Sequence, residues 1–154
     1  MNFPSGHLFD GLDKAQIKKL EGIAKIMHVE KRQSIFKEGD EATSVYVLEE
    51  GAVELTTFVE RDFELPISIL RNRGDMFGSS ALLAPHVYSL SARCAEKGKI
   101  LRFESNTLKQ IMSEDHSLGC RIMSNLASYF FARLKETRQE LKIHFKTLLM
   151  STRS

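Results

Sequence analysis

Residues 74–92 read GDMFGSSALLAPHVYSLSA, a composition typical of a turn that binds anions. Its glycines allow a tight turn, and Ser79 and Ser80 precede a short apolar run that can start a helix. Backbone N–H groups at the start of a helix bind phosphates and carboxylates. The stretch contains no Lys or Arg, however, and His86 is its one potential cation. The chemistry indicated is anion binding by the main chain, without the usual cationic side chain.

Side chains outside the stretch could replace this missing cation. The nearest in sequence are Arg71, Arg73 and Arg93, which flank it on both sides. His86 can itself carry charge near neutral pH, and a bound anion would favour that form. Arginines at strand ends are more often simply solvated, so the identity of the cation stays open.

Motifs of enzyme chemistry are lacking elsewhere in the sequence. It has no nucleophile elbow, HExxH motif, Walker loop or dinucleotide fingerprint. Glu114 and Asp115 are adjacent at a helix start, where carboxylates suit the helix dipole. His116 and Cys120 are spaced for a helix face, but no third metal ligand accompanies them. We therefore predict a non-catalytic protein without a metal site.

Length and composition indicate one globular domain: the chain has 154 residues, of which 42% are hydrophobic and 27% charged. No apolar run reaches the roughly 20 residues of a membrane span, and the first residues lack the pattern of a signal peptide. Cys94 and Cys120 form no CxxC motif, and without an export signal they are expected to be reduced thiols. We expect a cytoplasmic protein, and its net charge of +2 does not demand a nucleic-acid partner.

Hydrophobic periodicity predicts the elements that must position the 74–92 stretch. A capping box at Asp13 and Gln16 starts a helix over 13–27, within an N-terminal helical segment 8–28. Segment 29–104 is predicted to be a β-barrel, because short alternating runs are separated by turn signals. Its expected strands are 34–37, 44–48, 52–58, 63–70, 87–92 and 99–103, with turns at 49–51 and 96–98 and Pro66 at an edge or bulge. Segment 105–150 is predicted to be helical, with a long helix starting at Asp115 or Ser117.

The long C-terminal helix carries an apolar stripe with spacing close to a heptad repeat. Its members are Leu126, Phe130, Leu134, Thr137, Leu141, Phe145 and Leu148. The stripe outruns a small barrel, which favours a homodimer through this helix, with Leu126, Phe130, Leu134 and Leu141 in the interface. Packing on the chain's own barrel is the alternative. A basic stripe on the same helix (Lys135, Arg138, Lys142 and Lys146) is interpreted as its solvated face, with contact to an anionic surface as the alternative.

Four ordered motifs make the chain resemble the cyclic-nucleotide-binding domain family. They are IFKEGD at 35–40, SVYVLEEGAVEL at 44–55, GDMFG at 74–78, and SALL followed by PHVYSLSA. The resemblance covers roughly residues 9–145. It implies a mainly β fold: an antiparallel jelly-roll-like β-barrel (double-stranded β-helix) with an N-terminal helix and a long C-terminal helix.

The same resemblance implies a ligand cassette at residues 77–89. Its expected ligand-binding residues are Phe77, Gly78, Ser79, Ser80, Ala81, Leu82, His86, Val87, Tyr88 and Ser89, joined by Thr137 of the long helix. In the family's pattern a Glu binds the ribose and an Arg binds the phosphate. Here Ser79 replaces the Glu, and the Arg position matches His86 with a gap or Tyr88 without one. A hydrogen bond to a charged group contributes about 1.5–3 kcal/mol, so losing the Arg weakens phosphate binding by about 10- to 150-fold.

Two hypotheses from different classes follow from these residues. The first is a non-catalytic regulatory sensor that binds a cyclic nucleotide (cAMP or cGMP) or another small anion and signals through its C-terminal helix. The second is a degenerate, ligand-free module for protein interaction or dimerisation, with its cassette filled by Tyr88 or Leu83. Since the sequence ends at Ser154, before the helix-turn-helix domain of the family's transcription factors, it could also be the sensor half of such a regulator.

Overall fold

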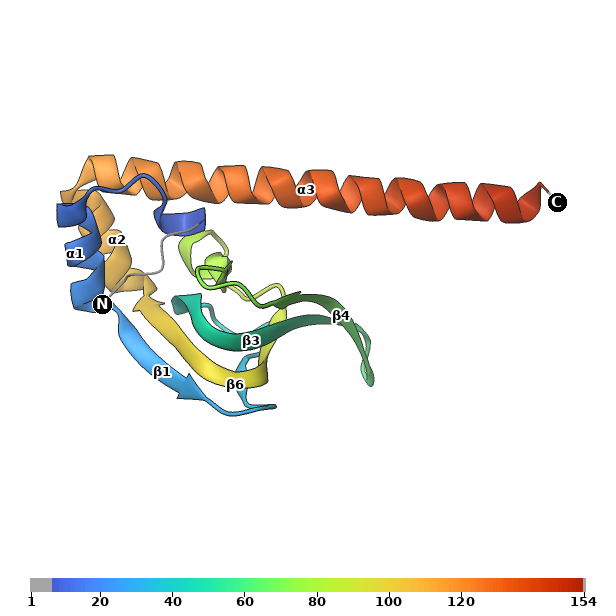
Figure 1. Cartoon of the computed structure of the whole chain (residues 1–154), viewed down its shortest axis with the longest axis horizontal. Helices are drawn as coiled ribbons and strands as arrows, with labels where there is room; N and C mark the ends of the chain where they lie inside the picture. The colour runs from blue at the N-terminus through green and yellow to red at the C-terminus, as the bar shows by residue number, and fades with distance from the viewer. Residues whose placement is uncertain (1–6, 154) are drawn as a thin grey trace.

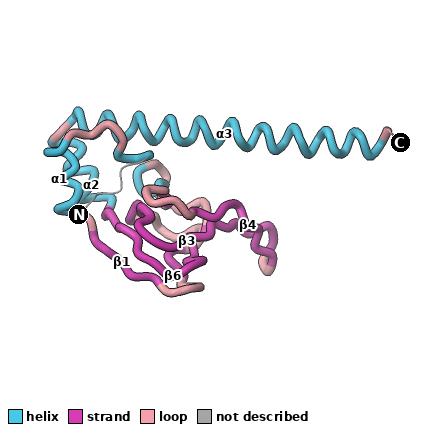
Figure 2. The backbone as a smooth tube through the Cα atoms, viewed as in Figure 1, coloured by secondary structure: helices cyan, strands magenta, loops and turns pink. Residues whose placement is uncertain are grey.

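In the computed structural model, which describes residues 7–153, a curved antiparallel sheet lies beneath one long helix (Figure 1). Figure 2 shows the helices gathered at one end and along one side of the strands. The elements in chain order are η1 (His7–Phe9), α1 (Lys14–Ile23), β1 (Lys25–Val29), β2 (Ser34–Phe36), β3 (Ser44–Glu60), β4 (Phe63–Leu70), β5 (Met76–Phe77), η2 (Ser79–Leu82), β6 (Ser91–Glu104), α2 (Ser105–Glu114) and α3 (His116–Thr152).

The sheet has the strand order β1-β6-β3-β4, with β2 paired to β6 and β5 paired to β3. All of these pairs are antiparallel. The predicted fold class is confirmed: the protein is mainly β, with a jelly-roll-like sheet, an N-terminal helix and a long C-terminal helix. The sheet curls into a roll without closing as a complete barrel.

The N-terminal helix begins as predicted and ends earlier than predicted. The Gln16 amide donates to Asp13 Oδ1 at 2.8 Å, and the Asp13 amide donates to Gln16 Oε1 at 3.0 Å, completing the capping box. Helix α1 nevertheless ends at Ile23, so the helical segment 8–28 was wrong at its C-terminal end. Residues 25–29 pair with β6 instead, because a ladder along the sheet edge satisfies their backbone groups.

Two predicted hairpin turns are wrong, because each lies within a long strand. The segments around Gly51 and Gly98 face each other across the β3–β6 ladder, where the register shifts. Gly51 has φ +92°, and a Cβ on Gly98 would collide with the Glu50 carbonyl oxygen. The glycine signals therefore mark β-bulges that bend the two strands together and curl the sheet.

Strand β4 has the predicted bounds, Phe63–Leu70. It pairs with β3 at the end of the strand order, and the register shifts where Thr56 faces Pro66. Proline lacks an amide donor, which is tolerated at an edge strand or a bulge. The position predicted for Pro66 is therefore confirmed.

The core is divided into two apolar clusters on opposite faces of the sheet. Val45 and Val47 of β3 join the cluster beneath the helices, which includes Phe103, Leu118 and Ile122. Tyr46 and Leu48 alternate to the other face and fill the inside of the roll. Because both faces of β3 are covered here, its sequence reads as a continuous apolar run.

Helix α3 begins where predicted: Asp115 is its N-cap and accepts from the Leu118 amide at 3.1 Å. Its first turns are buried against η1 and α2 through Leu118, Gly119, Ile122 and Leu126, and all but Gly119 belong to the core cluster that also contains Val45 and Phe103. Beyond them the helix runs past the roll into open space (Figure 1). No helix within residues 7–153 is both long and apolar enough to cross a membrane.

Candidate ligand site

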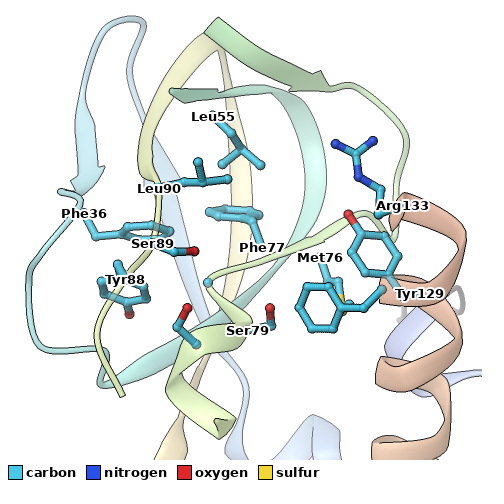
Figure 3. A pocket seen from close by; sticks show the side chains of 13 residues that line it. Phe36, Leu55, Met76, Phe77, Ser79, Tyr88, Ser89, Leu90, Tyr129 and Arg133 are labelled. Atoms are coloured by element: carbon cyan, nitrogen blue, oxygen red, sulfur yellow. The ribbon is translucent and has the colours of Figure 1, made fainter. Parts of the chain in front are cut away.

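A pocket lies between the roll and α3, at the cassette predicted from the sequence. Its cavity volume is about 150 Å³. Strand and loop residues that line it include Phe36, Leu55, Met76, Phe77, Leu90, Gly78, Ser79, Ser80, Tyr88 and Ser89, and α3 contributes Tyr129, Phe130 and Arg133. Figure 3 shows Phe36 and Tyr88 on the wall opposite Tyr129 and Arg133.

The floor of the pocket is the turn from β5 into η2. Gly78 adopts a left-handed conformation with φ 75°, and a Cβ there would press on the Ser44 carbonyl at 3.1 Å. Glycine therefore allows the chain to turn sharply against β3. Ser79 and Ser80 line the pocket, while the Ala81 amide donates to the Gly78 carbonyl at 3.2 Å inside the turn. The Ala81 amide is consequently engaged within the protein.

Tyr88 occupies one of the two candidate positions of the family's phosphate-binding arginine. Its ring stacks on Phe36, with centroids 3.8 Å apart and planes 13° apart. Its hydroxyl donates to the Ser44 carbonyl at 2.7 Å and accepts from the Ser44 amide at 3.2 Å. Burial, with a smaller contribution from Tyr88, raises the pKa of neighbouring Tyr46 to about 12. The wall of the roll here is aromatic, tightly bonded and uncharged.

His86, the other candidate for that position, lies outside this pocket. Its imidazole Nε2 is 3.1 Å from the Lys109 ammonium nitrogen. The two side chains line a separate cleft together with Arg102 and Glu104. His86 has φ 60°, which turns the chain away from the pocket before it returns at Tyr88.

Four other predicted ligand residues are also placed elsewhere. Ala81 and Leu82 are buried in the two core clusters. Val87 is exposed and forms an isolated bridge with Glu41. Thr137 is exposed on α3, and its hydroxyl donates to the Arg133 carbonyl at 2.9 Å. The predicted residues that the fold does bring together around the pocket are Phe77, Gly78, Ser79, Ser80, Tyr88 and Ser89.

The three flanking arginines are bound to carboxylates rather than directed into the pocket. Arg71 donates to Glu96 at 2.8 Å, and Arg73 donates to Glu49 at 2.9 Å. Arg93 donates through Nη2 to both carboxylate oxygens of Glu64, each at 2.8 Å. These bonds lower the pKa of the Glu64 carboxyl, so the pair is charged at neutral pH. None of the three lines the pocket.

Arg133 is the one charged side chain among the described residues that line the pocket, and sequence reasoning missed it. Its Nη1 donates to Glu136 Oε2 at 3.1 Å, and 41% of its side chain is exposed. Tyr129 lies one helical turn before it and packs edge-on against His7, with centroids 5.6 Å apart. Burial raises the pKa of the Tyr129 phenol, which keeps it neutral. The i, i+4 spacing of Tyr129 and Arg133 was the available signal.

The predicted dimer residues divide between two environments. Leu126 is only 2% exposed and belongs to the core beneath the helices, so the structure corrects its assignment to an interface. Phe130, Leu134 and Leu141 are all exposed, and Phe130 also lines the pocket. Residues 7–153 contain no group of three or more His, Cys, Asp or Glu side chains that could hold a metal ion.

The roll, the pocket at its cassette and the long helix beside it make up the candidate ligand site. The profile of the cyclic nucleotide-binding domain matches residues 26–115, and the chain belongs to this family. This membership supports a regulatory role for the domain.

Individual relatives are distant in sequence. The "Anaerobic regulatory protein" of Bacillus subtilis (strain 168) is 24% identical over 128 residues, which cover 82% of this chain and 53% of that protein. The catabolite activator protein of Thermus thermophilus is 23% identical with a TM-score of 0.76, covering 90% of this chain and 62% of that one. The sensor domain of the transcriptional regulator DNR from Pseudomonas aeruginosa is 19% identical with a TM-score of 0.69, covering 85% of this chain and 87% of that one. The chain thus spans about half of the curated relative and less than two thirds of the Thermus protein.

Proposed function

We propose that this protein is a non-catalytic sensor whose pocket ligand signals through helix α3. One observation carries the proposal: the same pocket is lined by the cassette residues Ser79 and Ser80 and by Tyr129 and Arg133 of the helix. A ligand there would contact both the roll and the helix. If it binds one helix position more tightly, it shifts the population toward that position.

A cyclic nucleotide such as cAMP or cGMP, or another small anion, is the proposed ligand. Family membership and the position of the pocket at the cassette support this class. The substitution of Ser79 for the ribose-binding Glu, and the lack of a cassette arginine, argue for weak nucleotide binding.

The proposed signalling form is a homodimer joined along the distal part of α3. Leu134, Leu141, Phe145 and Leu148 are each about half exposed in the single chain. Their heptad-like spacing would let two copies bury them against each other. Because Leu126 is buried within the chain, the proposed interface starts after it, near Phe130.

Isothermal titration calorimetry with cAMP, cGMP and cyclic dinucleotides tests the ligand proposal. We expect saturable binding that is lost in Ser89→Tyr, because the new ring would occupy the pocket that Ser89 lines. Ser113→Tyr, at an exposed position on α2, is the matched control and should bind as the wild type does. Absence of heat at millimolar concentrations of every nucleotide would remove the nucleotide proposal.

A ligand-free interaction module is the second candidate, and one observation favours it. Tyr88 fills a family arginine position with a ring anchored to Phe36 and Ser44. Under this candidate, no small molecule changes the melting temperature. The sensor half of a transcription regulator is a variant of the first proposal, suggested by the longer relatives.

A further inference from the structure

We infer that the pocket takes a single-ring aromatic anion, and that Arg133 of the signalling helix supplies the cation that the cassette lacks. This inference rests on the proposed sensor function and names its ligand class. Three features carry it: the size of the cavity, the character of its walls, and the position of its one charged side chain.

The size of the cavity limits the ligand to about one ring. Its volume is about 150 Å³. An apolar cavity of about this volume is known to bind benzene, whereas sites for larger ligands typically measure about 300–1,000 Å³. A base, a sugar and a cyclic phosphate together would require the walls to move apart. The roll side of the pocket is held in place, since Tyr88 is stacked on Phe36 and doubly hydrogen-bonded to Ser44, so a ligand of that size would have to displace α3.

The walls are suited to a flat, apolar body. Phe36, Phe77 and Tyr88 form a stacked aromatic side on the roll, and Leu55 and Leu90 lie beside them (Figure 3). Tyr129 and Phe130 bring two further rings from α3. Aromatic side chains prefer offset stacking or edge-to-face contact with another ring, and this arrangement offers both.

The charge of the site selects an anion. Among the described lining residues Arg133 is the only charged one, and no Asp or Glu lines the pocket. Its bond to Glu136 joins side chains that are 41% and 62% exposed, and such surface pairs are weak. A ligand carboxylate can bind the guanidinium through two parallel bonds. The hydroxyls of Ser79 and Ser80 offer further donors at the floor of the pocket.

This arrangement links the ligand directly to α3. In the family's pattern the phosphate is bound by an arginine of the roll. Here an anion would attach to the helix itself and compete with the Arg133–Glu136 bond. Ligand charge would thereby stabilise one position of the helix relative to the roll.

Benzoate and benzamide, which share a shape and differ in charge, test the inference by NMR titration of the ¹⁵N-labelled protein. We expect benzoate to bind the wild type about tenfold more tightly, the lower end of what a bond to a charged group contributes. Arg133→Gln should reduce this ratio to about one and leave benzamide binding unchanged. Arg138→Gln, an exposed arginine on the same helix that does not line the pocket, should behave as the wild type does. Glu136→Gln should strengthen benzoate binding about two- to threefold by releasing Arg133.

Equal affinity of the two probes for the wild type, or a preference for benzoate that persists in Arg133→Gln, would overturn the inference. Loss of the preference in Arg138→Gln would also overturn it, since the general charge of the helix would then be responsible. Binding of cAMP that Ser89→Tyr abolishes and benzoate does not displace would leave the sensor function intact and reject the ligand class. If neither nucleotides nor ring probes produce shifts sensitive to Ser89→Tyr, the sensor function and the ligand class fail together.

Discussion

The two halves of helix α3 both carry an apolar stripe but have opposite surroundings. In the proximal half, Leu118 and Ile122 are fully buried and Leu126 is 2% exposed. In the distal half, Leu141, Phe145 and Leu148 are 56%, 58% and 61% exposed. Segment η1, helix α2 and the core beneath them cover the first stripe, whereas the second stripe extends beyond them (Figure 1). The comparison teaches that an apolar stripe favours burial, whereas the extent of the neighbouring elements decides how much of it the chain itself covers.

The candidate pocket lies at the junction of these halves. Tyr129, Phe130 and Arg133 follow the last fully covered residue, Leu126, and precede the fully exposed stretch. A ligand at this junction would contact α3 at the point beyond which the rest of the chain no longer covers the helix. Under the proposed sensor function, the proximal half would anchor the helix and the distal half would transmit its position.

Removing a buried side chain from the proximal half should have the largest effect on stability. Ile122→Ala leaves a cavity beneath the helices and should lower the free energy of unfolding by about 2–5 kcal/mol. Ile143→Ala is the matched control, because Ile143 is 62% exposed and lies away from the heptad stripe. It should change that free energy by less than about 0.5 kcal/mol. Urea denaturation followed by circular dichroism measures the free energy of unfolding of both variants. Similar losses of stability in the two would contradict the difference between the two halves of α3.

A charge on the distal stripe should disrupt association while leaving the fold intact. Leu141→Asp places a carboxylate in the proposed interface and should weaken dimerisation by about 30-fold or more, equivalent to about 2 kcal/mol. Ile143→Asp, on the opposite side of the helix, should associate as the wild type does. Sedimentation velocity across a concentration series compares the three proteins. A wild type that stays monomeric at every concentration would refute the proposed interface.

A Gly→Ala substitution inside a helix normally stabilises a protein, but the close packing of α3 on α2 should make it destabilising in α3. A Cβ on Gly119 would lie 2.8 Å from the Met112 carbonyl oxygen, so Gly119→Ala should destabilise the protein by about 1–3 kcal/mol. Gly22→Ala in α1 has open space around the new methyl group. It should stabilise by about 0.5–1 kcal/mol through helix propensity. Thermal denaturation measures whether each variant is more or less stable than the wild type. A stabilising Gly119→Ala would show that the helices are less tightly packed.

Asp115, the N-cap of α3, should give the smallest effect, seen as a pH dependence of its contribution to the melting temperature. The bond from the Leu118 amide, aided by Lys19 and Gln16, lowers the pKa of the Asp115 carboxyl. Because the pKa of Asp115 is lower in the native state, the cap stabilises the protein fully above the pKa of the unfolded state, about 3.9. This stabilisation disappears as the pH falls through the native pKa. The difference in melting temperature between wild type and Asp115→Ala should thus be constant from pH 7 to about 5 and shrink below about 4. A difference that instead grows in acid would contradict the cap.

Much of the fold could be predicted because its signals are local. The capping box at Asp13, the strand 63–70 and the start of the long helix at Asp115 depend on neighbouring residues, and the structure confirms them. The errors arose where a local signal has two meanings. Glycines at 51 and 98 indicate a turn or a bulge equally well, and only the facing strand determines which one forms.

The site was predicted less completely, for a related reason. The cassette residues adjacent in sequence, such as Ser79 and Tyr88, do line the pocket. His86 was a candidate ligand contact because it lies in the same stretch, yet its imidazole lies against Lys109 outside the pocket. Arg133 lies 44 residues beyond Ser89, and only the docking of α3 on the roll brings it to the pocket.

The sequence by itself determined the class of fold, the position of the cassette, and the two absent family residues, since all three are encoded in short motifs of fixed spacing. The tertiary structure alone decided which arginine reaches the pocket, how large the cavity is, and where the covered part of the helix ends. Those properties depend on the curvature of the sheet and on where α3 docks. Both arise from contacts between residues far apart in the chain, which no local pattern records.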